Sequence, residues 1–338
     1  MIGNRYKYGF IDLSYILMRN VYAASRGKKV GEFGPNDVIK MTIQTLNKMS
    51  RDHGISVDKY IFIRDQWSRE YQGYYRTHLL SGLYKDTREY ITKDKLREME
   101  NDPNVTPDAL EDARMKCYIN EVKTESKRII INSLKDFGIP CIGVEGFEFD
   151  DIAYIAAAML YSMDDKPSVI ITKDSDLTYS LTPKMDYFRI PTGGSAPQII
   201  TYSEMYDKIP DEIKNRGVNL YVYKAYLDSL GEGHNDMRKT KKDYLDPTKV
   251  ILQILDGDYS GLTDYEVFLT QFKTFQVETF PKFNEVQRII ANDLDKVGKL
   301  GSLEEFKEFC NAYEISGISD RYFSEFINRF DSSLYGKN

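Results

Sequence analysis

Carboxylate side chains occur at four points between residues 12 and 176, each near an apolar segment. They are Asp12, then Asp65, then Glu148 with Asp150 and Asp151, and then Asp174 with Asp176. Each could be purely structural, because Asp is common at helix caps and in turns. Brought together, however, these carboxylates would repel one another strongly unless a cation neutralised them. The pattern therefore predicts a site that binds metal through oxygen ligands.

The metal that this pattern favours is Mg²⁺, with Mn²⁺ as a substitute. The three cysteines and three histidines are scattered along the chain, so no zinc site is expected. Hard divalent cations prefer carboxylate oxygens. Two such ions about 4 Å apart commonly support in-line cleavage of phosphodiester bonds, one activating a water and the other stabilising the leaving 3′ oxygen. The acidic residues thus indicate a phosphodiesterase.

A basic and aromatic segment, residues 68–85, follows Asp65 closely. Its arginines and lysines could contact phosphates, and its tyrosines could stack on bases. The candidate nucleic-acid contacts here are Arg69, Tyr75, Arg76, Tyr84 and Lys85. The structural alternative is a solvated helix face that carries half-buried tyrosines.

Alternating strands and helices are expected to position these residues. Apolar segments predict strands at residues 8–17, 58–67 and 167–181, and helical spacing predicts helices at 37–54, 125–140 and 150–163. This order implies an α/β fold with a parallel sheet, whose functional groups gather beyond the carboxyl ends of the strands. A charged, partly helical insertion is expected over residues 69–114. The chain is expected to be mostly helical from Ile209, including helices at 248–255, 283–297 and 303–313.

The bulk properties are those of a globular protein of one large domain, or of a main domain with a smaller one. The chain has 338 residues, of which 41% are hydrophobic and 29% charged. No segment resembles a membrane span or a secretory signal, so we expect a soluble cytoplasmic protein. The net charge of −6 is only weak evidence against nucleic-acid binding, because local patches can differ from the whole.

The ordered segments FIDLSY, FIRD with REYQGYYR, FEFDD and TKDSDL resemble the flap endonuclease/5′→3′ exonuclease family. Within it, they look most similar to the ribonuclease H of T-even-type phages. The resemblance extends from about Gly9 to Phe330. It implies a central, mostly parallel sheet flanked by helices, as in PIN-like 5′-nucleases. It further implies a helical arch and a helix–hairpin–helix element. On this basis we expect a nuclease domain at residues 1–208, with the arch at about 69–114, and an α-helical subdomain at 209–338.

The resemblance also implies roles for individual residues. Those that match the tight metal site of the family are Asp12, Asp65, Glu148, Asp150 and Asp174. Asp151 and Asp176 match its close neighbours. The family often has a Tyr-Lys pair before the arch, and this chain offers Tyr75-Arg76 and Tyr84-Lys85. Arg76 and Lys85 are therefore both candidates to hold the scissile phosphate, and the sequence does not choose between them.

The chain departs from the family pattern in two places. The family's second acidic motif, Gly-Asp-x-x-Asp-Asn, corresponds here to residues 231–236, which read GEGHND. We predict Glu232 and Asp236 as ligands of a second metal ion, with Asp228 in reserve; the alternative is a plain polar loop. A basic run replaces the family's Gly-x-Gly hairpin and could grip duplex phosphates, or could be solvated surface. Its members are Arg238, Lys239, Lys241 and Lys242.

The function implied is a structure-specific 5′-nuclease that removes RNA primers or flaps from DNA or RNA–DNA hybrids during phage replication. The protein would act as a monomer in the cytoplasm of an infected bacterial cell. A phage single-strand-binding protein or sliding clamp could be a partner. One alternative is a PIN-type ribonuclease. Another is a catalytically silent relative that only binds nucleic acid.

Overall fold

The computed structural model describes residues 5–52, 56–80, 91–163, 167–190, 198–232, 237–295 and 302–315. The chain separates into two compact units. The first comprises Met1–Phe62, Arg88–Cys141 and Lys296–Asn338, and the second Ile63–Thr87 and Ile142–Asp295. Residue 208, the predicted domain boundary, lies inside the second unit. None of the described helices combines the length and apolar character needed to cross a bilayer.

The chain forms a mixed sheet of mostly parallel strands flanked by helices, which confirms the predicted fold class. Its six strands have the order β3-β2-β1-β4-β5-β6. β4 pairs in parallel with β5, and β5 pairs antiparallel with β6. All five residues of β4 are buried, as expected of a strand covered on both faces. The strands are β1 Arg5–Asp12, β2 Ser56–Ile63, β3 Cys141–Ile142, β4 Ser168–Thr172, β5 Met185–Arg189 and β6 Gln198–Ile200.

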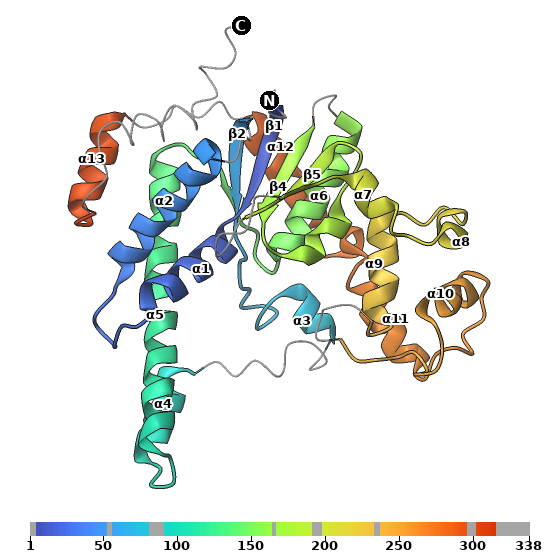
Figure 1. Ribbon diagram of the computed structural model, residues 1–338, viewed down its shortest axis with the longest axis horizontal. Helices are drawn as coiled ribbons and strands as arrows, with labels where there is room; N and C mark the ends of the chain where they lie inside the picture. Colours follow the sequence, from blue (N-terminus) through green and yellow to red (C-terminus); the bar gives the residue numbers. More distant parts are fainter. Residues whose placement is uncertain are drawn as a thin grey trace, which may run out of the picture. The chain divides into compact units, whose positions relative to one another are not determined.

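The helices of the first unit are α1 Leu13–Ser25, α2 Pro35–Asp52, α4 Lys93–Asn101, α5 Pro107–Asp136 and α13 Leu303–Ala312. Three of them, α1, α2 and α5, lie side by side (Figure 1). Between α1 and α2, the buried Asn20 amide donates a hydrogen bond to Thr42 at 3.0 Å. α5 begins with Thr106 as its N-cap and Pro107 in its first turn. It ends before Gly138, whose φ of 68° suits a helix C-terminus.

An exposed helical hairpin projects from this unit. α4 has no buried residue and packs on α5. Lys93 pairs with Glu121 at 2.9 Å, and Glu100 with Arg114 at 2.8 Å, so the two helices run antiparallel. Among the described residues of the expected insertion, residues 75–80, 93–101 and 107–114 are helical and residues 69–74 are not. Residues 81–90 lie outside the described residues.

The second unit is mostly helical around β4, β5 and β6. Its helices are α3 Tyr75–Leu80, α6 Phe149–Met163, η1 Ser175–Ser180, α7 Tyr202–Tyr206, α8 Asp211–Lys214, α9 Leu220–Ser229, α10 Pro247–Leu255, α11 Tyr265–Lys273, η2 Val277–Thr279 and α12 Phe283–Asp295. The short 3₁₀-helix η1 contacts both α6 and α9. The rings of Tyr154 on α6 and Tyr221 on α9 stack with centroids 3.6 Å apart. α6, η1 and α9 thus form one packed group.

Several elements differ from the sequence expectation. The predicted strand at residues 8–17 ends at Asp12, where α1 begins, because the Asp12 carboxylate accepts a hydrogen bond from the Tyr15 amide at 2.8 Å. The predicted helix at 125–140 is the second half of the longer α5. Strands β5 and β6 were not anticipated.

Candidate active site

Two loops of the second unit are joined by backbone hydrogen bonds, and these bonds position the first candidate residues. The Gln66 amide donates to Phe147 O at 3.1 Å, and the Gly146 amide donates back to Gln66 O at 2.8 Å. The Tyr75 amide then donates to Gly146 O at 2.9 Å. The loop that carries Asp65 and the start of α3 are therefore fixed against the loop that leads into α6.

Gly146 makes this close approach possible. Its φ is 88°, which L-residues with a side chain rarely adopt. A Cβ at this position would lie 2.9 Å from two carbon atoms of the Tyr71 ring. Nearby, the Glu145 carboxylate accepts hydrogen bonds from Ser68 Oγ at 3.1 Å and from the Arg69 amide at 3.2 Å. Arg69 itself is exposed, with its backbone held in place.

The N-terminus of α6 brings several predicted carboxylates together. Asp65 Oδ1 accepts a hydrogen bond from the Phe149 amide at 2.8 Å, although 84 residues separate the two. Asp151 Oδ2 accepts one from the Glu148 amide at 3.1 Å. Both carboxylates satisfy amides that a helix leaves unpaired in its first turn. The capping role considered from the sequence is thus present, and it places Asp65 beside the segment from Glu148 to Asp151.

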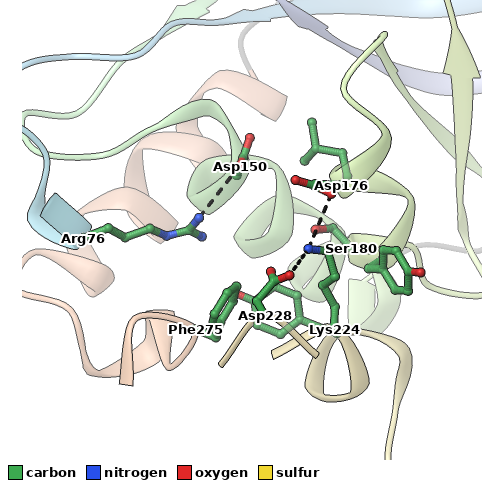
Figure 2. A pocket seen from close by; sticks show the side chains of 10 residues that line it. Arg76, Asp150, Asp176, Ser180, Lys224, Asp228 and Phe275 are labelled. Atoms are coloured by element: carbon green, nitrogen blue, oxygen red, sulfur yellow. Dashed lines mark hydrogen bonds and ion pairs between the residues drawn. The ribbon is translucent and has the colours of Figure 1, made fainter. Parts of the chain in front are cut away.

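Arg76 is the buried cation of this cluster. Its side chain is 8% exposed, and its Nη2 lies 2.5 Å from Asp151 Oδ1. Its Nη1 lies 3.8 Å from Asp150 Oδ2, as Figure 2 shows. The guanidinium carbon is also 5.6 Å from the centroid of the Phe275 ring. Burial alone would lower the pKa of Arg76, but the neighbouring acidic groups, led by Asp151, raise it well above its ordinary value.

The carboxylates around Arg76 carry more negative charge than it neutralises. The pKa of Asp150 is raised well above its ordinary value, first by burial and next by the charge of Asp174. The pKa of Asp151 is raised to about 6 by burial, against the opposing effect of Arg76, so this carboxyl is still ionised at neutral pH. Asp174 Oδ1 accepts a hydrogen bond from the Asp176 amide at 3.0 Å and so caps η1.

A second buried cation, Lys224, was not identified from the sequence. Its side chain is 7% exposed, and its Nζ lies 3.4 Å from Asp176 Oδ1. The same ammonium forms a closer ion pair with Asp228, whose side chain is fully buried (Figure 2). Lys224 and Asp228 lie four residues apart on α9. A lysine and an aspartate at this spacing in the apolar sequence LYVYKAYLDS are the signal that could have indicated the pair.

One pocket of the second unit is bordered by most of these groups. Its charged lining residues come from α3, α6, η1 and α9, and are Arg76, Asp150, Asp176, Lys224 and Asp228. The pocket therefore alternates carboxylates and cations on a packed helical frame. Such an arrangement can bind an anion at the cations or a metal ion at the carboxylates.

Glu232, from the altered acidic motif, contacts two lysines of the basic run, Lys239 and Lys241. The Lys241 ammonium is 4% exposed and lies 3.2 Å from Glu232 Oε1. It also donates a hydrogen bond to Leu245 O at 2.7 Å. Lys239 lies 3.7 Å from Glu232 and 2.8 Å from Asp243. In this structure Glu232 is thus paired with Lys239 and Lys241, and Lys241 is buried. Asp236 lies outside the described residues.

The remaining predicted residues differ in burial and in the contacts they make. Asp12 belongs to the first unit, is 7% exposed and caps α1. The Tyr75 ring packs edge-on against Tyr71 and Phe280, with centroids 5.2 and 4.7 Å away. Arg238 is exposed, and its backbone amide donates to Gln271 at 2.8 Å. Lys242 is partly exposed. Tyr84 and Lys85 lie outside the described residues.

The donor atoms around the α6 N-terminus are carboxylate oxygens. Among the described residues, no three or more His, Cys, Asp or Glu side chains already converge to hold one ion. The carboxylates of Asp150, Asp174 and Glu148 nevertheless interact electrostatically and offer only oxygen donors. Their chemistry fits a hard divalent cation. The Asp176 and Asp228 carboxylates do not fit one in the same way, because the Lys224 ammonium already contacts both.

No protein-family model matches the chain, and no curated protein sequence matches it significantly. Solved structures that match it include a bacteriophage T5 flap endonuclease in complex with DNA and metal ions. That structure is 14% identical, covers 96% of this chain and 99% of its own, and has a TM-score of 0.43.

Two further matches are DNA complexes. The catalytic core of Rad2 with a DNA substrate is 14% identical, covers 96% of this chain and 92% of its own, and has a TM-score of 0.43. Human GEN1 with Holliday junction DNA is 14% identical, covers 96% of this chain and 71% of its own, and has a TM-score of 0.48. These TM-scores are below 0.5, so the similarity does not by itself assign a family or an activity.

Proposed function

We propose that this protein is a metal-dependent, structure-specific 5′-nuclease that hydrolyses phosphodiester bonds of DNA or RNA–DNA hybrids. The observation that supports the proposal is the charged pocket of the second unit. Asp150 lines it beside the buried Arg76, Asp174 acts electrostatically on Asp150, and Asp65 binds the Phe149 amide next to Asp150. Burying several like charges is costly, and such groups cluster at functional sites.

The residues that would hold a divalent ion are Asp150, Asp174 and Glu148, with Asp65 close by at the α6 N-terminus. We propose Mg²⁺, with Mn²⁺ as a substitute. When bound, such an ion would lower the pKa of a water and neutralise charge that develops on the phosphate. Asp12 remains part of the proposed ligand set on the strength of its motif.

Arg76 would position the scissile phosphate. Its Nη2 contacts Asp151, and this ion pair together with the nearby Phe275 ring limits the orientation of the guanidinium. Its Nη1 is 3.8 Å from Asp150, longer than a hydrogen bond, so this nitrogen is available for a phosphate oxygen. A buried guanidinium that is always charged is suited to positioning a phosphate of a polyanionic substrate. We therefore favour Arg76 over Lys85 for this role.

The exposed hairpin of α4 and α5 would form the described part of an arch that admits single-stranded 5′ ends. By its resemblance, the enzyme would remove RNA primers or flaps in phage replication, with a single-strand-binding protein or sliding clamp as partner. The similarity to the ribonuclease H of T-even-type phages is part of the same proposal.

The decisive experiment compares three substrates: a 5′-flap duplex, a blunt duplex and single-stranded RNA, each with Mg²⁺ or with EDTA. We expect Mg²⁺-dependent cleavage of the flap duplex near the junction, and none with EDTA. Preference for single-stranded RNA would favour a PIN-type ribonuclease. Binding without any Mg²⁺- or Mn²⁺-dependent cleavage would identify a catalytically silent relative and refute the proposal.

A further inference from the structure

The ammonium of Lys224 occupies the position that a cation would take between two carboxylates. It lies 3.4 Å from Asp176 Oδ1 and is paired more closely with Asp228. The side chains of Lys224 and Asp228 are 7% and 0% exposed. The ammonium is also 5.7 Å from the centroid of the Tyr179 ring. Lys224 is thus a built-in part of the pocket wall and is held by contacts on several sides.

Two sides of the pocket differ in their charge balance. On the η1–α9 side, the two carboxylates Asp176 and Asp228 share one lysine, which leaves a formal charge of −1. On the α6 side, the carboxylates Glu148, Asp150, Asp151 and Asp174 act on one another, and Arg76 contacts Asp150 and Asp151. A divalent cation is therefore strongly attracted to the α6 side. On the η1–α9 side it would have to displace a buried ammonium.

We propose that Lys224 is the second cation of this site, so that the protein binds one divalent ion where a two-metal enzyme binds two. The Lys224 side chain would supply the positive charge beside Asp176. This inference rests on the proposed nuclease function. It concerns the number of metal ions bound per chain, which can be measured without a cleavage assay.

Lysine and a divalent ion are not equivalent in this position. An ammonium donates hydrogen bonds and carries one charge, but it cannot coordinate a water and lower its pKa as a metal ion does. Lys224 would therefore act as a fixed electrostatic partner for a phosphate oxygen. The water-activating ion would be confined to the side of Asp150.

The test is to count the Mn²⁺ ions bound per chain by calorimetry and by electron paramagnetic resonance of free Mn²⁺. We expect one specific ion in the wild type. Asp150→Asn should abolish it, and Asp176→Asn should leave the count at one. A wild-type count of two that falls to one in Asp176→Asn would overturn the proposal.

Lys224→Ala provides the complementary measurement, because it removes the ammonium and leaves room beside Asp176 and Asp228. We expect its count to rise to two, and the double variant Lys224→Ala/Asp176→Asn to return to one. Lys241→Ala is the matched control, since Lys241 is a buried lysine that pairs with Glu232. Its count should stay at one.

A folded Lys224→Ala protein, verified by its thermal melt, that still binds one ion would overturn the proposal. If this variant fails to fold, the numbers of Mn²⁺ ions bound by the wild type and by Asp176→Asn test the proposal. The proposed function fails by a different result, namely no flap cleavage with Mg²⁺ or Mn²⁺. That result does not depend on how many Mn²⁺ ions Lys224→Ala and the wild type bind per chain.

Discussion

Several acidic residues of the candidate site have structural contacts as well as a proposed chemical role. Asp65, Asp151 and Asp174 each accept a hydrogen bond from a backbone amide at the start of a helix. These bonds fix one oxygen of each carboxylate, and thereby limit the orientation of the side chain. Capping and catalysis are therefore compatible roles, because the cap holds the carboxylate in place at no cost to its charge.

Asp150 is the residue whose loss should separate binding from catalysis. Asp150→Asn keeps the shape of the side chain but removes a charge from the α6 side. We expect cleavage of a 5′-flap duplex to fall by more than about 100-fold, as for loss of a metal ligand. Binding of the same duplex should persist within about threefold. Asp211→Asn, on an exposed residue of α8, is the control. Wild-type cleavage by Asp150→Asn would remove Asp150 from the site.

Glu232 is expected to matter for stability, because it is a counterion of the buried Lys241. Glu232→Gln should lower the free energy of unfolding by about 1–2 kcal/mol, since Lys241 keeps its carbonyl partners but loses its charge partner. The Mg²⁺ concentration for half-maximal cleavage should not change. Urea unfolding and a Mg²⁺ titration check both points, with Glu212→Gln as an exposed control. A raised Mg²⁺ requirement at unchanged stability would instead indicate that Glu232 is a metal ligand.

Cys310, in the first unit, offers a test of pH dependence. Burial raises the pKa of its thiol to about 11, from an ordinary value of 9.0. The folded state therefore favours the neutral thiol, and this contribution to stability is present below about pH 9 and is lost as the pH rises through 11. At pH 8.5, iodoacetamide should modify the partly exposed Cys141 well before Cys310.

Peptide mass spectrometry in the native state and in urea measures this difference. The thiolate fraction of Cys310 should rise about 100-fold on unfolding, as two pKa units imply. Equal rates for Cys141 and Cys310 in the native protein would contradict the buried position of the Cys310 side chain.

Among the helices and strands, the periodicity of apolar residues predicted those whose sequence pattern is local. α2, α6, α10 and α12 begin within two residues of the expected positions, because apolar spacing and N-terminal Pro or Asp residues are local features. β5 was missed because its sequence, MDYFR, is short and mixed, and it becomes a strand through pairing with β4. The Lys224–Asp176 contact joins two helices distant in sequence, so no local pattern could reveal it.

The loop at Gly146 should be sensitive to a single methyl group. Gly146→Ala adds a Cβ that meets the Tyr71 ring at 2.9 Å and also forces a residue with a side chain to a φ of 88°. We expect a loss of about 2–4 kcal/mol in the free energy of unfolding. Gly217→Ala is the matched control, because Gly217 has a φ of 74° and open space around it, and should lose only about 1 kcal/mol. Equal losses would refute the close approach.

For the whole molecule, the net charge of −6 means that the proposed nucleic-acid substrate would have to be bound by local cationic groups. Each phosphate that such a group neutralises contributes about −0.9 to the slope of log affinity against log salt. For Asp150→Asn, which should bind without cutting, we expect a slope steeper than about −2 on a 5′-flap duplex. Fluorescence anisotropy from low to physiological salt measures it. A slope near zero would contradict binding through phosphates.

The length of α5 has a mechanical consequence within the first unit. Its 30 residues form one uninterrupted helix, paired with α4 in its first part and packed against α1 and α2 elsewhere. A helix of this length is about 45 Å long. It can therefore act as a lever: a tilt of about 5° at one end displaces the other by about 4 Å, given that length. A load on the exposed hairpin would therefore be transmitted along α5 to the side chains of α1 and α2 that pack against it.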